Sequence, residues 1–261
     1  MSISELSILF PALVAGILIS TIHVPLGAEV VKRGIIFVDL AIAQLAAMGA
    51  FMAVLLFHEW EGTLVYALAV QGLAFLCALA GGLFFMYVEK RYPKIEEPTI
   101  GCIFVLSATL VLLVLSQNAH VGEHLKDLLA GQLLFISWSQ IALLGSAAAF
   151  FALLLFRFPS LISGKWFYLF FAAFVTVSVQ FAGIYLVFAT LVFPAVGVYG
   201  VARHKNKLLL GYLGSSLGLV GGLLSAFWWD LSAGPAVVWG IALSMLVIFG
   251  VTSTKSSTQR G

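Results

Sequence analysis

Three polar side chains interrupt long apolar runs of this chain, and all three are of types that bind metal ions. His23 offers an imidazole nitrogen, Asp39 offers carboxylate oxygens and Gln44 offers a neutral amide oxygen. A carboxylate inside an apolar run is costly in lipid, so it usually faces a partner or a water-filled cavity. These residues therefore predict a cation path between helices, with His23, Asp39 and Gln44 as its candidate ligands.

Each candidate also has a structural interpretation. Asp39 lies about 9 Å beyond Arg33 along a helix axis, so it could form a buried salt bridge with Lys32 or Arg33. His23 could be hydrogen-bonded to a neighbouring helix. Asp39 and Gln44 are about 140° apart around an α-helix, so they could share one ion only where the helix is broken.

A second group of candidates follows the pattern H-x-x-E-H at His120, Glu123 and His124. In inverted zinc peptidases this pattern supplies two zinc ligands and a general base. Here it contains the helix-weakening Gly122 and has only Asp127 nearby as a further ligand. Three interpretations stay open, namely an external metal-capture site, an intramembrane metallopeptidase and an ordinary polar loop.

The elements that must position these residues are membrane-spanning helices. Of all residues, 62% are hydrophobic and only 9% are charged, which leaves no stretch for a soluble domain of typical size. Apolar runs of about spanning length occupy residues 7–30, 35–57, 63–88, 99–116, 137–156, 208–229 and 234–252. The net charge of +2 is small and gives no indication of a nucleic-acid partner.

Basic residues predict how the chain is oriented. All 13 Lys and Arg residues except Lys126 lie in or beside alternate gaps between the apolar runs. Basic residues of short loops face the cytoplasm. We therefore expect a multi-pass membrane protein with the N-terminus outside and the C-terminus in the cytoplasm.

The segment 166–202 has basic residues at both ends and is too long for one crossing. Two short helices that fold back near residues 180–183 would keep both ends inside. The fold class predicted is thus all-α, a polytopic transmembrane bundle of about nine helices. We expect residues 1–252 to form one transmembrane domain, residues 253–261 a polar cytoplasmic tail, and residues 120–136 an external interfacial helix.

Five segments together resemble a known family, the permease subunits of ATP-binding-cassette importers for zinc, manganese and related divalent metals. They are a basic turn leading to an acidic residue (30–39), an acidic-Thr-x-Gly helix start (97–101), a Leu-rich segment with glycine (128–137), a turn between short helices followed by Pro-Ala (177–195), and an acidic-Leu-x-x-Gly-Pro turn (230–235). The segments cover nearly the whole chain, which is identified as a divergent member with a fold like that of type II importers.

The resemblance implies a permease homodimer, or paired permease, driven by a cytoplasmic ATPase and fed by an external metal-binding protein. It implies no cofactor on this chain, a divalent metal ion as cargo and ATP on the partner. The sequence agrees, because its Gly164-Lys165 is followed by Trp166 and forms no phosphate-binding loop. Residues 199–207, after the Pro-Ala element, are the candidate coupling helix, with Pro194, Val201 and Arg203 as coupling residues.

The chain departs from the resemblance at its metal ligands. Many members carry a His four residues after the acidic residue of the second helix, whereas this chain has Ala43. The choice between zinc and manganese thus stays open. An ion-coupled secondary transporter is the alternative from another class, although the missing internal repeat disfavours it.

Overall fold

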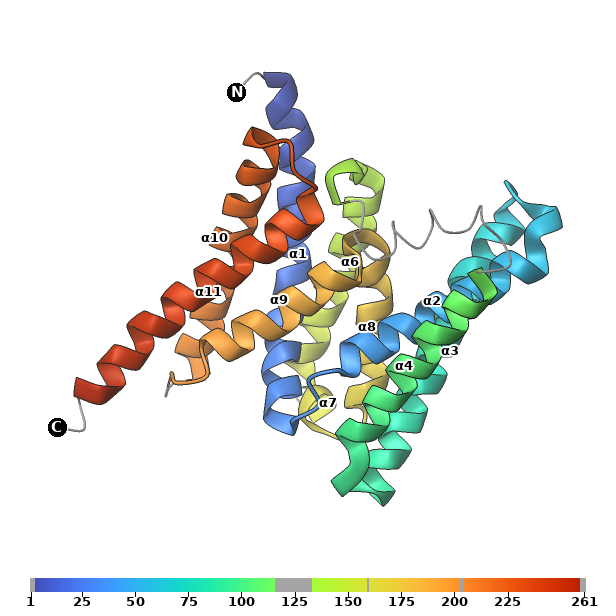
Figure 1. Cartoon of the computed structure of the whole chain (residues 1–261), viewed down its shortest axis with the longest axis horizontal. Coiled ribbons are helices and arrows are strands. Elements are labelled where there is room, and N and C mark those ends of the chain that lie inside the picture. Colours follow the sequence, from blue (N-terminus) through green and yellow to red (C-terminus); the bar gives the residue numbers. More distant parts are fainter. Residues whose placement is uncertain (1–2, 116–132, 159, 202–203, 259–261) are drawn as a thin grey trace.

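The computed structural model describes residues 3–115, 133–158, 160–201 and 204–258, and all the regular structure in these ranges is helical (Figure 1). The long helices are α1 (Ile3–Arg33), α2 (Val38–Phe57), α3 (Leu64–Arg91), α4 (Glu96–Leu115), α6 (Trp138–Arg157), α8 (Phe167–Ala182), α9 (Ile184–Gly197), α10 (His204–Trp228) and α11 (Ala233–Thr258). The short ones are η1 (His58–Trp60), η2 (Pro93–Ile95), η4 (Leu133–Phe135) and α7 (Ser160–Ser163). The all-α prediction is confirmed for this part of the chain.

Seven of the helices are long and apolar enough to cross a membrane, and α8 and α9 are two shorter apolar helices. Within the described ranges these seven and two make up the nine helices predicted, at closely matching positions. The chain is thus a multi-pass membrane protein. Residues 120–132 of the predicted interfacial helix (120–136) lie outside the described residues, and Leu133–Phe135 at its end form the short helix η4.

Local side-chain chemistry fixes several helix ends. At the start of α6, Gln140 N–H donates to Ser137 Oγ (3.4 Å), and Ser137 N–H donates to Gln140 Oε1 (2.8 Å), which forms a capping box. The break between α8 and α9 falls at Gly183, whose φ of +78° suits glycine far better than a residue with a Cβ. The predicted fold-back near residues 180–183 is confirmed.

The helices pack into a bundle with α1 near its centre (Figure 1). α1 contacts α6, α9 and α10, while α2 runs beside α3 and α4, and α10 runs beside α11. At Gly27 of α1 an added Cβ would collide with the carbonyl oxygen of Leu191 in α9. Such small residues let membrane helices approach closely, so the α1–α9 contact depends on glycine.

The ends of the helices separate into two sets. Figure 1 places the N-terminus and the α10–α11 connection toward the top, and the C-terminus, α7 and the α1–α2 connection toward the bottom. The basic ends of α1 and α3, at Arg33 and Arg91, belong to the lower set. This arrangement fits the predicted alternation of loops, and which set faces the cytoplasm stays a prediction.

Candidate functional site

His23 is fully buried in α1, and both of its ring nitrogens have hydroxyl partners. Nδ1 lies 2.6 Å from Thr190 Oγ1 of α9, and Nε2 lies 3.0 Å from Ser178 Oγ of α8. The Thr190 hydroxyl also donates to the Leu186 carbonyl at 2.9 Å, so its oxygen is left to accept from Nδ1–H while Nε2 accepts from Ser178. The ring thereby ties α1 to the paired short helices. A metal ion at His23 would require one of these bonds to break.

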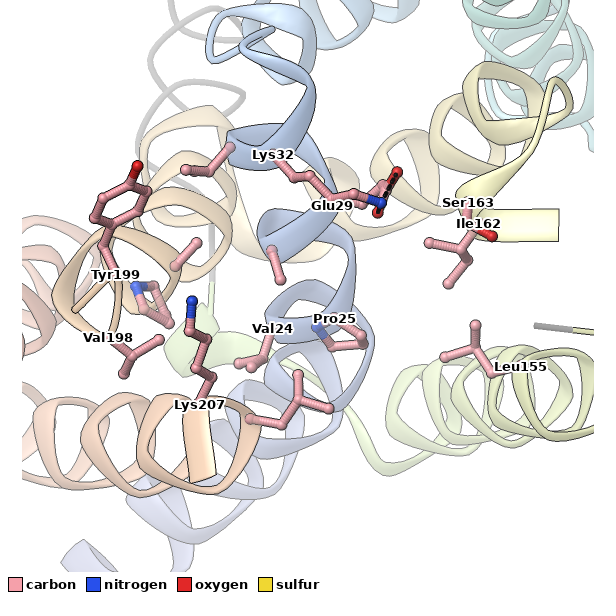
Figure 2. A pocket seen from close by; sticks show the side chains of 15 residues that line it. Val24, Pro25, Glu29, Lys32, Leu155, Ile162, Ser163, Val198, Tyr199 and Lys207 are labelled. Carbon is pink, nitrogen blue, oxygen red and sulfur yellow. Dashed lines mark hydrogen bonds and ion pairs between the residues drawn. The ribbon is translucent and has the colours of Figure 1, made fainter. Parts of the chain in front are cut away.

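A cavity of about 870 Å³ opens between α1, α6, α7, α9 and α10 (Figure 2). Its walls are mostly apolar and include Pro194 of the Pro-Ala element, and its charged groups are Glu29, Lys32 and Lys207. Lys207 Nζ lies 5.8 Å from the centroid of the Tyr199 ring, within cation–π distance. The predicted coupling segment thus forms part of the cavity wall.

The described part of that segment is not a separate helix. After α9 the chain turns, with Val201 N–H donating to the Val198 carbonyl at 3.0 Å, and α10 begins at His204. Val201 is half-buried and Pro194 is buried within α9, whereas Arg203 lies outside the described residues. The expectation of a coupling helix is therefore replaced, in the described residues, by a turn that leads into α10.

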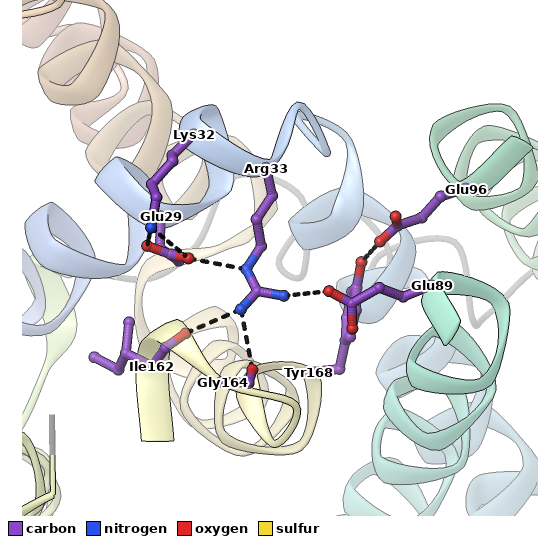
Figure 3. Close-up of polar contacts among 8 residues, drawn as sticks. All are labelled: Glu29, Lys32, Arg33, Glu89, Glu96, Ile162, Gly164 and Tyr168. Carbon is purple, nitrogen blue, oxygen red and sulfur yellow. Dashed lines mark hydrogen bonds and ion pairs between the residues drawn. The ribbon is translucent and has the colours of Figure 1, made fainter. Parts of the chain in front are cut away.

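Arg33 is the centre of a polar network at the end of α1 (Figure 3). Its guanidinium donates to Glu29 Oε1 (3.1 Å), Glu89 Oε1 (2.5 Å) and the carbonyls of Ile162 (3.4 Å) and Gly164 (3.0 Å). Lys32 Nζ lies 3.2 Å from the second oxygen of Glu29. Every guanidinium nitrogen is thus hydrogen-bonded, and both basic residues are paired with glutamates.

Asp39 does not take part in that network. Its side chain is 2% exposed, and neither carboxylate oxygen has a hydrogen-bond partner among the described residues. The N–H groups of Asp39 and Leu40 in the first turn of α2 approach the carboxylate without reaching hydrogen-bond geometry. The interpretation of Asp39 as a salt-bridge partner of Lys32 or Arg33 is wrong for this structure, because both cations are bound to glutamates.

Glu97 of α4 is a second carboxylate at this place, and it was missing from the candidates derived from the sequence. Its Oε1 accepts a hydrogen bond of 3.2 Å from Phe37 N–H, just before α2 begins, while its Oε2 is buried and unpartnered among the described residues. Glu97 is close enough to Asp39 for the two charges to repel. The sequence marks Glu97 only as the acidic start of segment 97–101, which is a weak signal for a metal ligand.

Gln44 is buried on α2 at 6% exposure. α2 is continuous from Val38 to Phe57, so the helix break that would let Gln44 and Asp39 share an ion is absent from this described segment. With about 140° between them, the two side chains point to different sides of α2.

The external candidates His120, Glu123 and His124 lie outside the described residues. Within the described ranges, no three His, Cys, Asp or Glu side chains converge in a way that could hold a metal ion. The arrangement in the described part is instead a pair of carboxylates, Asp39 and Glu97, set at the start of α2.

Comparisons with known proteins cover nearly the whole chain. The model of a family described as "ABC 3 transport family" matches residues 5–164 and 159–252. A relative from Haemophilus influenzae, "High-affinity zinc uptake system membrane protein ZnuB", is 25% identical over 251 residues, covering 88% of this chain and 92% of its own. A solved structure, "PsaBC from Streptococcus pneumoniae in complex with Fab", has a similar fold, with a TM-score of 0.73, 19% identity and coverage of 95% of this chain and 94% of its own.

Proposed function

This chain belongs to the ABC 3 transport family, and from that premise we propose that it is the membrane-spanning permease subunit of an ATP-driven importer of divalent metal ions, zinc or manganese. The curated relative is named for zinc uptake, which supports this class of cargo. The proposed direction of transport is inward, into a prokaryotic cell, across its plasma membrane.

The observation that carries the proposal is the state of Asp39. A carboxylate buried among membrane-spanning helices without a partner is strongly unfavourable, and it is kept where it serves transport. Divalent cations need negatively charged oxygens to replace water inside a membrane. Asp39 is accordingly assigned to the translocation path.

The other tasks of an importer fall to partners. The chain has no phosphate-binding loop of the Gly-x-x-x-x-Gly-Lys-[Ser/Thr] type, so ATP hydrolysis is assigned to a cytoplasmic ATPase and the capture of the metal to an external binding protein. A second copy of this chain completes the proposed permease. In this scheme the N-terminus is outside and the C-terminus is in the cytoplasm.

The ATPase is proposed to dock on the turn after α9 and the start of α10. Val201 and Arg203 lie in this connection, and Pro194 joins it to the wall of the cavity. A displacement of this turn would reach α1 through α9 and the α1–α9 contact at Gly27. That mechanical path is short, which supports a coupling role for Pro194, Val201 and Arg203.

The test is metal uptake by cells that express the chain with its cognate ATPase and binding protein. Asp39→Asn keeps the shape of the side chain and removes its charge, so we expect uptake to fall at least about a hundredfold, equivalent to about 2.7 kcal/mol. Assembly in the membrane should stay normal, because the charge that is removed has no partner to lose.

The matched control is Glu59→Gln, which removes an exposed carboxylate in η1, directly after the other end of α2. It should leave uptake unchanged. Full uptake by a well-assembled Asp39→Asn protein would remove Asp39 from the path and with it the main support for the proposal.

A further inference from the structure

Unpartnered buried polar atoms are concentrated at one place in this protein. The described part of the chain has four such side-chain atoms, namely Asp39 Oδ1, Asp39 Oδ2, Glu97 Oε2 and Ser215 Oγ. Three of the four are carboxylate oxygens, and they belong to two side chains that interact electrostatically. Buried polar atoms are normally satisfied, so this concentration indicates that something else contacts these oxygens.

The starts of α2 and α4 lie side by side, because these two helices pack together. The hydrogen bond from Phe37 N–H fixes Glu97 Oε1 at the start of α2, two residues before Asp39. Since one oxygen of Glu97 is held in this way, its other oxygen has a defined position beside α2. Three unpartnered carboxylate oxygens thus belong to the adjoining starts of α2 and α4.

Among the described residues, neither Asp39 nor Glu97 forms a salt bridge. Arg33 uses all its guanidinium nitrogens on Glu29, Glu89 and two carbonyls, and Lys32 is bound to Glu29. Asp39 is buried and Glu97 is half-buried, so two ionised carboxylates at this place would repel each other and be unfavourable without a counter-charge. One divalent cation carries the charge that balances both.

We propose that Asp39 and Glu97 together bind the transported cation through oxygen atoms alone, and that this pair makes the protein suited to manganese(II) rather than specialised for zinc. The proposal rests on the proposed function and adds Glu97 as a second ligand and a preferred cargo. Two side chains leave room for water molecules in the coordination sphere, which suits a site that must also release its ion.

The preference follows from the missing nitrogen donors. Position 43, one helical turn after Asp39, is alanine, and both ring nitrogens of His23 are occupied by Thr190 and Ser178. Imidazole and thiolate ligands favour zinc, whereas carboxylate, carbonyl and water ligands suit manganese. At an oxygen-only site, zinc therefore loses most of the affinity advantage over manganese that it has at sites with nitrogen ligands.

The competing explanation is that Glu97 only caps the start of α2. Glu97→Gln distinguishes the two, because the glutamine keeps an oxygen to accept from Phe37 N–H and loses only the charge. A cap would survive this substitution, whereas a charged metal ligand would not.

The experiment measures Mn²⁺ binding to the full-length chain in lipid nanodiscs, from the loss of the sharp electron paramagnetic resonance signal of hydrated Mn²⁺. Glu97→Gln should weaken binding by at least about tenfold, the lower end of what even ligand-orienting groups contribute. Glu59→Gln, with an exposed carboxylate changed in the same way, should bind like the wild type. Wild-type binding by Glu97→Gln would overturn the assignment of Glu97.

Two measurements on the wild type do not depend on how any variant folds. Electron spin echo spectra of the bound Mn²⁺ should contain no coupling to a directly bound nitrogen, and Zn²⁺ should compete with an affinity no more than about tenfold higher. A coupled nitrogen, or a zinc preference of about a hundredfold or more, would overturn the oxygen-only site.

These results separate the inference from the function it rests on. If Asp39→Asn abolishes uptake while Glu97→Gln binds and transports normally, the permease proposal stands and the role of Glu97 falls. If Asp39→Asn transports normally, the proposed path itself is wrong.

Discussion

His23, within α1, and Asp39, in the first turn of α2, are both buried polar residues of the membrane bundle, yet their surroundings are opposite. Both nitrogens of His23 are hydrogen-bonded to hydroxyls of α8 and α9. Both oxygens of Asp39 lack a partner among the described residues. A polar residue whose hydrogen-bonding groups all have partners holds its helices together. A buried charge without a partner is unfavourable, and a bound ligand of opposite charge can remove that cost. The comparison therefore separates residues that hold the bundle from residues that act in it.

The Arg33 network is the strongest satisfied cluster, so its loss should have the largest effect on stability. Arg33→Leu leaves Glu29 and Glu89 without their shared cation and should lower the free energy of unfolding by about 3 kcal/mol, the lower end for breaking a buried ion pair. Thermal unfolding of the detergent-solubilised protein, followed by tryptophan fluorescence, measures the change.

Lys32→Leu is the control for Arg33. Lys32 Nζ reaches the same glutamate, but its side chain is 69% exposed, so water screens the pair and the cost should stay below about 1 kcal/mol. Equal destabilisation by the two substitutions would show that the network acts through charge alone and not through the hydrogen bonds of the buried Arg33 guanidinium.

His23 should give a smaller effect, and one confined to stability. His23→Ala removes two hydrogen bonds and leaves the hydroxyl of Ser178 without its acceptor, at a cost of about 2 kcal/mol. Binding of Mn²⁺ should stay within about twofold of the wild type, since the ring is committed to α8 and α9. The measurements are thermal unfolding and Mn²⁺ titration on the same preparation.

A second variant sharpens the result for His23. The double variant His23→Ala, Ser178→Ala should lose less than the sum of the single variants, because they share one hydrogen bond. If His23→Ala instead abolished Mn²⁺ binding, His23 would be a metal ligand, and the division between structural and functional polar residues would be wrong.

Much of the architecture was predictable because lipid imposes strong rules on the chain. Apolar length locates the spanning helices, and basic residues at 165 and 203 required an even number of crossings between them, which predicted the α8–α9 pair. Gly183 marks the place where the pair turns. Such features depend on local sequence and on one global rule, so a single sequence suffices.

The site was less predictable because it depends on which distant helix ends meet. Sequence proximity suggested Lys32 or Arg33 as partners of Asp39, but the geometry of α1 directs both to Glu29, three and four residues earlier. Glu97 lies 60 positions after Phe37, and it accepts a hydrogen bond from the Phe37 N–H. Asp39 has no salt bridge to Lys32 or Arg33, and Glu97 lies near the start of α2. Both facts follow from tertiary packing, which leaves no periodic signal in the sequence.

The smallest effect is expected at Ser215, which tests whether the comparison between partnered and unpartnered residues extends to neutral groups. Ser215 of α10 is fully buried, and its hydroxyl is the remaining unpartnered atom of the described residues. A neutral hydroxyl costs far less to bury than a carboxylate, so the argument made for Asp39 does not extend to it. Ser215→Ala should raise the free energy of unfolding by up to about 1 kcal/mol, because it removes an unsatisfied group, and should change neither Mn²⁺ binding nor uptake. Thermal unfolding resolves this shift. A clear loss of stability or of uptake would place a partner at Ser215 and would mean that unpartnered neutral groups, too, mark functional positions in this bundle.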